Sequence, residues 1–215
     1  MDKYHKIQTV FKRDPATKYK TLLLNDYSTP EFKYLEKNKW IFTEKVDGTN
    51  IRVVYDKDEI SFKGKTDKAQ IPHPLLKRLN ERFRPQLDLF RQTFADGVCF
   101  YGEGYGSKIQ RGGGNYREDQ DFVLFDVKCG RWWLQREAVE DVAKQFGVDV
   151  VPIIGQGTLL EMVIKIQRGF NSVWGGFMAE GIVARPYVEL VARNGERVIT
   201  KIKHKDFNLL QKEVE

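Results

Sequence analysis

Short runs of β-branched and aromatic residues with polar neighbours dominate the chain and predict β-strands. Turn-forming residues separate most of these runs. Asn194-Gly195 predicts a type I′ hairpin, because both central residues of that turn need positive φ, and Asp56-Lys57-Asp58 marks a similar, weaker turn. The expected strands are Trp40–Glu44, Ile51–Tyr55, Glu59–Lys63, Val98–Glu103, Phe122–Lys128, Gly181–Arg185, Val188–Arg193 and Arg197–Lys203.

Apolar positions at helical spacing lie between these runs. Thr29-Pro30 predicts a capped helix start that leads into Phe32–Lys37. A second stripe runs from Leu75 to Phe90, and Pro85 should kink or divide it. Two more stripes, expected to face the core, consist of Ala138, Val139, Val142, Ala143 and Phe146, and of Leu159, Leu160, Val163, Ile164 and Ile166.

Hairpin-linked strands with intervening helices predict an α+β fold built on antiparallel sheet. No linker, internal repeat or low-complexity segment interrupts the 215 residues, so we expect a single domain over 1–215. Hydrophobic residues make up 41% of the chain, enough for a sizeable core, which argues against disorder. No apolar run approaches the ~20 residues of a membrane-spanning helix. Together with two cysteines expected to be reduced, Cys99 and Cys129, this predicts a cytoplasmic protein without membrane contact.

Positive charge is concentrated in three segments. The chain has 36 Lys and Arg residues against 30 Asp and Glu, a net charge of +6. The excess lies mainly in residues 1–20, 61–91 and 192–205. Such blocks favour a polyanionic partner such as nucleic acid or a nucleotide. Charge alone leaves a simple solvated basic surface equally open.

Lys45 stands at the end of a predicted strand and is followed by Asp47 and Gly48. This Lys-x-Asp-Gly spacing is also compatible with a surface turn. Other strand ends strengthen the functional interpretation, because they carry Glu103, Glu180 and the alternating pair Lys201 and Lys203. The last two side chains are two residues apart on a predicted strand and therefore share a face, with Ile202 opposite.

These residue types suit nucleotidyl transfer. A lysine amine is protonated at neutral pH, and nearby cations with partial desolvation favour its neutral, nucleophilic form. Lys65, Lys201, Lys203 and a bound metal are the expected sources of that field around Lys45. The same cations would hold an α-phosphate, and glutamates would supply oxygen ligands for Mg²⁺ and acceptors for ribose hydroxyls.

The sequence resembles the covalent nucleotidyltransferase superfamily of polynucleotide ligases and mRNA capping enzymes. It looks most like the ATP-dependent RNA ligases of the nick-sealing phage branch. The resemblance spans roughly residues 40–207 and implies the adenylation-domain fold. The matching motifs, in family order, are Glu-Lys-Val-Asp-Gly-Thr-Asn (44–50), Tyr-Gly-Glu-Gly (101–104), Asp-Phe-Val-Leu-Phe-Asp-Val (121–127), Ala-Glu-Gly-Ile-Val-Ala-Arg-Pro (179–186) and Val-Ile-Thr-Lys-Ile-Lys (198–203).

The resemblance implies a role for each motif residue. Lys45 is the lysine that becomes linked to AMP, Glu103 accepts from the ribose hydroxyl, and Phe125 stacks on adenine. Glu180 helps to place the metal, Mg²⁺ or Mn²⁺.

The remaining motif residues lie beside the nucleophile or near the α-phosphate. Lys201 and Lys203 grip that phosphate. Glu44 and Asn50 flank the nucleophile and shape the adenine end and the transfer step respectively.

The chain departs from the family pattern in three places. Lys65 stands where the family usually has an arginine, which keeps the charge but loses the bidentate fork. Position 47 is Asp, as in most of the superfamily, whereas the nearest phage relatives have His. The chain also stops soon after the last motif, so we expect no appended oligonucleotide-binding domain.

The implied activity is that of an ATP-dependent RNA ligase, which joins a 5′-phosphate end to a 3′-hydroxyl end, in a nicked duplex or between single strands. DNA nick sealing and GMP transfer to an mRNA end use the same chemistry and stay open. A third alternative is a catalytically inactive nucleic-acid-binding module.

Overall fold

The computed structural model describes residues 3–208, and their packing divides the chain into two compact units. The described part of unit 1 consists of residues 3–4 and 47–151. Unit 2 consists of residues 5–46 and 152–208. From residue 3 to residue 208 the chain therefore runs from unit 1 to unit 2, returns to unit 1 and then passes again into unit 2.

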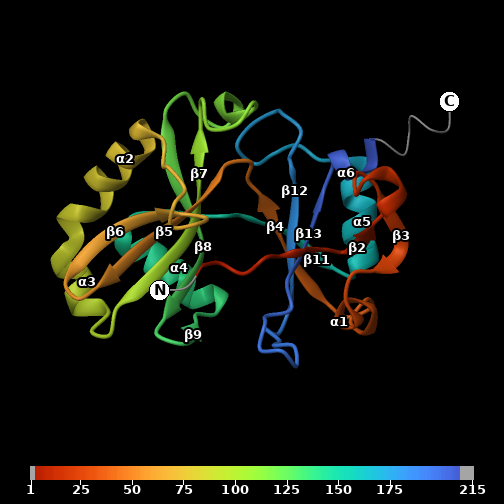
Figure 1. The fold of residues 1–215 in the computed structure, drawn as a ribbon, viewed down its shortest axis with the longest axis horizontal. Coiled ribbons are helices and arrows are strands. Elements are labelled where there is room, and N and C mark those ends of the chain that lie inside the picture. The colour runs from red at the N-terminus through yellow and green to blue at the C-terminus, as the bar shows by residue number, and fades with distance from the viewer. Residues whose placement is uncertain (1–2, 209–215) are drawn as a thin grey trace. The chain divides into compact units, whose positions relative to one another are not determined.

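Unit 1 is built around a six-stranded sheet in the order β10-β8-β7-β5-β6, with β9 paired to β8 (Figure 1). Neighbouring strands are antiparallel except β10 and β8. The strands are β5 (Thr49–Asp56), β6 (Glu59–Gly64), β7 (Val98–Gly106), β8 (Gln120–Cys129), β9 (Trp132–Trp133) and β10 (Asp149–Val150).

Helices cover one face of this sheet. They are α2 (His73–Phe83), the 3₁₀ turn η2 (Arg84–Gln86), α3 (Leu87–Thr93) and α4 (Arg136–Phe146), and a further 3₁₀ turn, η3, spans Gly113–Asn115. Buried side chains of α2, α3 and α4 form one core with alternate residues of β5, β7 and β8. Phe90 is at its centre, with ring contacts to Phe100 and Phe146. The opposite face of the sheet, called the free face below because α2, α3 and α4 all pack on the first, carries a smaller cluster of Val54, Cys99 and Tyr101 packed against Tyr4, Phe125 and Trp133.

Unit 2 contains a five-stranded sheet in the order β1-β13-β12-β4-β11 and a two-stranded sheet of β2 and β3. The strands are β1 (Gln8–Thr9), β2 (Phe11–Arg13), β3 (Leu22–Tyr27), β4 (Trp40–Lys45), β11 (Ile153–Gly157), β12 (Gly181–Pro186) and β13 (Thr200–Lys203). The helices are η1 (Pro15–Thr17), α1 (Pro30–Tyr34), α5 (Leu159–Arg168) and α6 (Lys205–Asn208).

Alternation along β4 explains how unit 2 separates its core from its chemistry. Trp40, Phe42 and Glu44 are buried, whereas Ile41, Thr43 and Lys45 are only partly buried. Because successive side chains of a strand point to opposite faces, the first set shares a face with the core of α1 and α5. Lys45 therefore lies on the face of the sheet away from that core.

The predicted helix starts and the break at Pro85 are confirmed, but α1 ends at Tyr34 and not at Lys37 as predicted. The Thr29 hydroxyl accepts from the amide of Phe32 at the start of α1, and the segment around Pro85 leaves the α-helical path as η2. The stripe on α5 is shifted from the one predicted. Leu160 is 55% exposed and Ile164 is also exposed, while Met162 is buried in their place. In α5 the core face follows Leu159, Met162, Val163 and Ile166, the spacing that 3.6 residues per turn requires.

The turn with two positive φ values is not the one that the sequence predicted. Lys57 and Asp58 have φ of 48° and 66°, so the turn between β5 and β6 is the one with two positive φ values. At Asn194-Gly195 only the glycine has positive φ, 83°, so the prediction of a type I′ turn there was wrong. The predicted strand Val188–Arg193 is reduced to a single antiparallel bridge between Val191 and Arg197.

The α+β class on largely antiparallel sheet is confirmed. Two parallel pairs, β1 with β13 and β10 with β8, were not predicted, because each involves a strand too short to show alternation. Within residues 3–208, none of the helices has the length and apolar character needed to cross a bilayer.

Candidate functional site

Lys45 and Lys203 lie on either side of Gly181 in the sheet of unit 2. Gly181 pairs with Lys45 across the β12–β4 ladder and with Lys203 across the β12–β13 ladder. A Cβ atom on Gly181 would come within 2.3 Å of the carbonyl oxygen of Ile202, so only glycine allows this close approach. The two lysines thus lie at the same level on β4 and β13, the strands on either side of β12.

Glu180, the residue before Gly181, forms ion pairs with the ammonium groups of Lys45 and Lys203. Lys45 Nζ donates to Oε2 at 2.6 Å, and Lys203 Nζ lies 2.5 Å from Oε1. The amide of His204 donates to the carbonyl oxygen of Glu180 and fixes its backbone beside the end of β13. The side chains of Lys45, Glu180 and Lys203 are only 20%, 10% and 24% exposed, so water screens this cluster weakly.

The cluster modifies the electrostatic picture expected from the sequence. Neighbouring cations were expected to act directly on Lys45, but a carboxylate stands between Lys45 and Lys203. Lys45 Nζ also donates to its neighbour's carbonyl, Val46 O, at 3.3 Å. In this arrangement Lys45 is held as a hydrogen-bond donor. Two ammonium groups and one carboxylate give the cluster a net charge of one positive unit, which attracts an anion.

Lys201 lies on the same face as Lys203, one level further along the sheet. It pairs with Val183, which in turn pairs with Thr43 on β4. Ile202 between the two lysines is fully buried in the core. The predicted alternation of β13 is therefore confirmed, and both lysines lie on the face of Lys45.

Glu44 lies on the opposite face of β4 from Lys45. It is 1% exposed, and its Oε2 accepts from the amide of Val173 in the segment that leads to Glu180. Its Oε1 is buried and has no hydrogen-bond partner among residues 3–208. Glu44 thereby ties the strand of the candidate nucleophile to the segment before Glu180, and its predicted role at the adenine end stays a prediction.

In unit 1, Asn50 and Glu103 are cross-strand neighbours. They pair in the β5–β7 ladder, on the face of the sheet that the helices leave free. Gly48 lies beside them, and a Cβ atom there would stand 2.2 Å from the carbonyl oxygen of Gly104. The glycine of the Lys-x-Asp-Gly motif therefore permits a close backbone approach. Asn50 Oδ1 is buried without a partner among the described residues, so an acceptor is left for an incoming donor.

Phe125 occupies a β-bulge. Tyr101 pairs with Asp126 and Gly102 pairs with Leu124, which leaves Phe125 as the extra residue of β8. The bulge shifts the alternation by one residue, because Leu124 before it and Val127 after it contact the same core. Phe125 and Asp126 are consecutive yet both lie off that core, with Phe125 partly exposed and Asp126 buried.

Lys65 follows β6 and is exposed, and its loop is held by a residue that the sequence analysis missed. Arg52 is 1% exposed, and its Nε donates to Gly64 O at 3.1 Å while its Nη2 donates to Asp67 Oδ1 at 2.8 Å. This hydrogen bond lowers the pKa of the Asp67 carboxyl below its ordinary value. The signal in the sequence was an arginine inside an otherwise apolar strand.

The residues fit a metal that is held together with substrate phosphates rather than in a protein cage. Among the residues that the structure describes, His, Cys, Asp and Glu nowhere form a group of three that could hold an ion. Glu180 offers one carboxylate, and Mg²⁺ is commonly bound by one or two carboxylates together with phosphate oxygens and water. Both oxygens of Glu180 face lysines, so metal binding there requires a lysine to turn to another anion.

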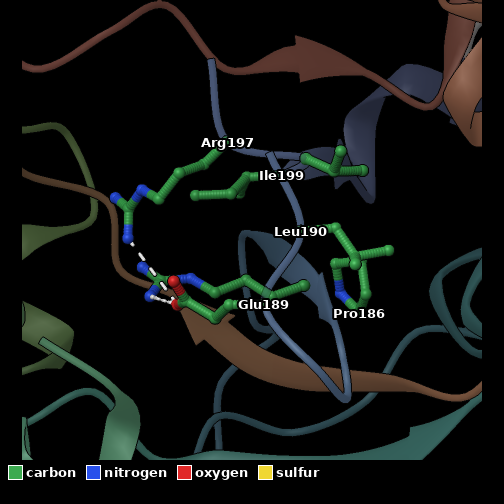
Figure 2. A pocket seen from close by; sticks show the side chains of 7 residues that line it. Pro186, Glu189, Leu190, Arg197 and Ile199 are labelled. Carbon is green, nitrogen blue, oxygen red and sulfur yellow. Dashed lines mark hydrogen bonds and ion pairs between the residues drawn. The ribbon is translucent and has the colours of Figure 1, made fainter. Parts of the chain in front are cut away.

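A small hollow lies at the other end of β12, near Arg185 and Pro186. Arg185 and Arg197 both form ion pairs with Glu189, with Nη1 to Oε1 distances of 3.3 Å and 3.7 Å. Figure 2 shows Arg197 and Glu189 at this hollow. Apolar side chains, including Pro186 and Leu190, line the rest. None of the residues predicted from the sequence as site residues lines this hollow, whose charges hold the segment between β12 and β13.

Comparison with protein families supports the motif assignment. The family model described as RNA ligase matches residues 38–203, more than half of the chain. The match includes Lys45, Glu180, Lys201 and Lys203 in unit 2, and Glu103 and Phe125 in unit 1.

Solved structures share the fold. A variant of the Naegleria gruberi RNA ligase with ATP and Mn matches 99% of this chain and 58% of its own, with 17% identity and a TM-score of 0.69. Another variant with ATP and Mn matches 82% of this chain and 54% of its own, with 20% identity and a TM-score of 0.63. The same enzyme with PPi matches 99% of this chain and 60% of its own, with 17% identity and a TM-score of 0.66. The chain thus has the nucleotidyltransferase fold of these ligases and spans slightly more than half their length.

Proposed function

Because the chain belongs to the RNA ligase family, we propose that it is an ATP-dependent RNA ligase that works through a covalent lysyl-AMP intermediate. The observation that carries the proposal is the convergence of Lys45 and Lys203 on Glu180 within unit 2. A lysine at a strand end, a second lysine and a shared carboxylate form a compact, weakly screened cluster that fits a nucleophile with its phosphate-binding partner.

In the first step Lys45 Nζ attacks the α-phosphorus of ATP. The Nζ–phosphorus bond forms, the bond from that phosphorus to the bridging oxygen breaks, and pyrophosphate leaves with the electron pair. Nζ must lose a proton to attack, and Glu180 Oε2, 2.6 Å away, is an acceptor in position to take it. Lys203 and Lys201 supply positive charge on the same face for the α-phosphate.

The divalent metal, Mg²⁺ or Mn²⁺, would be held by Glu180 together with the phosphates and would neutralise charge on them. When an anion engages Lys203, the ammonium is drawn away from Glu180 Oε1 and that oxygen becomes available. The residues therefore change partners when ATP binds. Lys203 pairs with phosphate, and the Glu180 carboxylate binds the metal or accepts the proton that leaves Lys45.

The residues that the motif resemblance assigns to the nucleoside belong to unit 1. Phe125 on the bulge offers a partly exposed ring for the adenine, and Glu103 offers a carboxylate for ribose hydroxyls. Asn50 Oδ1 is an acceptor with no partner in the described residues, which suits a hydroxyl or amine donor. Lys65, on the loop held by Arg52, offers a further positive charge.

Two further transfers complete the reaction. A 5′-phosphate oxygen of RNA attacks the phosphorus of the adduct, the Nζ–phosphorus bond breaks, and Nζ regains its proton. A 3′-hydroxyl, losing its proton, then attacks the 5′-phosphorus, and AMP leaves. Positioning and charge neutralisation supply most of the acceleration in such phosphoryl transfers.

The basic segments at residues 1–20 and 61–91 would hold the RNA backbone. Neutralising phosphates with Lys and Arg releases counterions, so binding should weaken steeply as salt increases. Cys99 and Cys129 are both free, which fits a reducing compartment such as the cytoplasm. One adenylation domain over 1–215, a nicked duplex as substrate and the phage-type branch all stay predictions.

Incubation with α-labelled ATP and Mg²⁺ tests the proposal. We expect label that survives denaturation in the wild type and in Lys37→Ala, a variant of an exposed lysine, but not in Lys45→Ala. Label from GTP instead of ATP would indicate capping chemistry. The absence of any adduct would favour a nucleic-acid-binding module and overturn the proposal.

The acceptor is tested with nicked duplexes that carry RNA or DNA on the 3′-hydroxyl side, and with single-stranded RNA ends. Sealing that requires RNA supports the proposal, whereas equal sealing of all-DNA nicks identifies a DNA ligase.

A further inference from the structure

The N-terminal residues 3–4 pack on unit 1, although residues 5–46 that follow them belong to unit 2. Tyr4 lies on the free face of the unit 1 sheet, where its hydroxyl donates to Asp126 Oδ2 at 2.5 Å. Asp126 is fully buried. The neighbouring Lys3 forms an exposed ion pair with Asp67, 3.8 Å apart, which contributes little by itself. Tyr4 is therefore the main attachment of this segment.

The ring of Tyr4 lies within contact distance of three other aromatic rings. Its centroid is 5.1 Å from Phe125 with the planes at 77°, 5.2 Å from Tyr101, and 5.6 Å from Trp133 at 84°. These distances and angles fall in the range where aromatic pairs attract beyond simple burial of area. Tyr4 thus touches the bulge twice, through its ring at Phe125 and through its hydroxyl at Asp126.

The bulge brings Phe125 and Asp126 within reach of one residue. Phe125 is the extra residue of β8 in the register of the β7–β8 ladder, so its side chain departs from the alternation of that strand. Its neighbour Asp126 lies on the same side because of the shifted alternation. A single residue that contacts both can fix the direction of the Phe125 ring, and Tyr4 contacts both.

We propose that Tyr4 is a positioning residue that holds the Phe125 ring in the orientation for stacking on the base of ATP. The inference rests on the proposed function, because it assigns Phe125 to the base. Tyr4 acts through Phe125 and Asp126 and needs no contact with the nucleotide. Its loss should weaken recognition of the nucleoside part of ATP and leave recognition of the phosphates intact.

The test compares Tyr4→Ala and Tyr4→Phe in the full chain, with Tyr34→Ala as a control because Tyr34 is 86% exposed in unit 2. Two quantities are measured: the ATP concentration for half-maximal adduct formation, and the inhibition constant of inorganic tripolyphosphate, which has no base. Tyr4→Ala should raise the first about tenfold, equivalent to one weakened aromatic contact, and leave the second unchanged. Tyr4→Phe keeps the ring and should restore most of the wild-type value.

Each other outcome overturns the inference. Equal weakening of ATP and tripolyphosphate, or no change in either, would mean that Tyr4 only packs the fold. A lower half-saturating ATP concentration would mean that Tyr4 covers the ring and competes with the base. Should Tyr4→Ala fail to fold, Tyr4→Phe and Tyr4→Leu provide the same comparison. An unlabelled wild type defeats the proposed function and the inference together, whereas a labelled wild type with unchanged variants defeats the inference alone.

Discussion

Lys45 and Lys203 approach the same carboxylate from the two strands that flank β12, and each takes a different oxygen of Glu180. Their shared cross-strand partner is Gly181. The motif Glu-Gly therefore has two physical tasks: the glutamate bridges two cations, and the glycine lets the flanking strands bring those cations close. Both tasks concern unit 2 alone and depend on the local ladder register.

Glu180→Gln should slow adduct formation at least about tenfold and lower the free energy of unfolding by about 1–3 kcal/mol. A carboxylate accepts from both lysines, but an amide turns a donor toward one of them. One ammonium then loses its partner in a weakly exposed cluster. Labelling rates and urea unfolding measure the two effects.

Glu31→Gln, a change at the first turn of α1 in the same unit, is the matched control. It should change the unfolding free energy by less than about 0.5 kcal/mol. Wild-type labelling and stability in Glu180→Gln would contradict the bridging role of the carboxylate.

Gly181→Ala should destabilise the fold by about 1–3 kcal/mol, because the added methyl group forces apart strands that are already in contact. The obstructing atom is the backbone carbonyl oxygen of Ile202, which cannot rotate away. Thermal or urea unfolding gives the cost. Gly176→Ala serves as the control, since a Cβ there would meet nothing within 4 Å. Equal stability of the two variants would show that the close approach is not needed.

Arg52→Met should raise the pKa of the Asp67 carboxyl towards its ordinary value. In the wild type the hydrogen bond from Arg52 favours the ionised carboxylate and so lowers that pKa. A ¹³C NMR titration of the aspartate carboxyls measures the change.

Asp58 provides an internal reference for that titration. Its carboxyl pKa is also lowered, but by Arg91, and should not move in Arg52→Met. An unchanged pKa of the Asp67 carboxyl in Arg52→Met would mean that Arg52 does not hold the loop that carries Lys65.

Much of the fold was predictable because its signals are local. The cap at Thr29, the helix break at Pro85 and the alternation of Lys201, Ile202 and Lys203 each depend on residues a few positions apart. The choice between two turns was not predictable in the same way. Asn194-Gly195 has the stronger turn sequence, yet the two-residue turn with positive φ formed at Lys57 and Asp58, where the β5–β6 pairing continues up to the turn.

The site was predictable as a set of residues but not as a set of contacts. Motif order pointed to Lys45, Glu180 and Lys203, whereas their shared ion pairs depend on ladder register, and Lys45 and Glu180 are 135 positions apart in the chain. The bulge at Phe125 and the contacts of Tyr4 were missed for the same reason. A bulge leaves no mark in one strand's composition, because it is a property of two strands.

Native Cys99 should react very slowly with a thiol reagent at pH 8. Burial raises the pKa of its thiol to about 11, so roughly one molecule in a thousand carries the reactive thiolate at that pH. Burial also raises the pKa of Cys129. Reaction with a chromogenic disulfide should give two fast thiols only in urea. Two fast thiols in the native protein would contradict the burial of Cys99.

The central claim is that Lys45 bonds covalently to AMP, and peptide mass spectrometry after incubation with ATP and Mg²⁺ tests it most directly. The account predicts that the peptide with Lys45 gains one adenylate, that pyrophosphate removes it, and that Lys45→Arg stays unmodified. Adenylate on another lysine, or an unmodified wild-type protein, would contradict it.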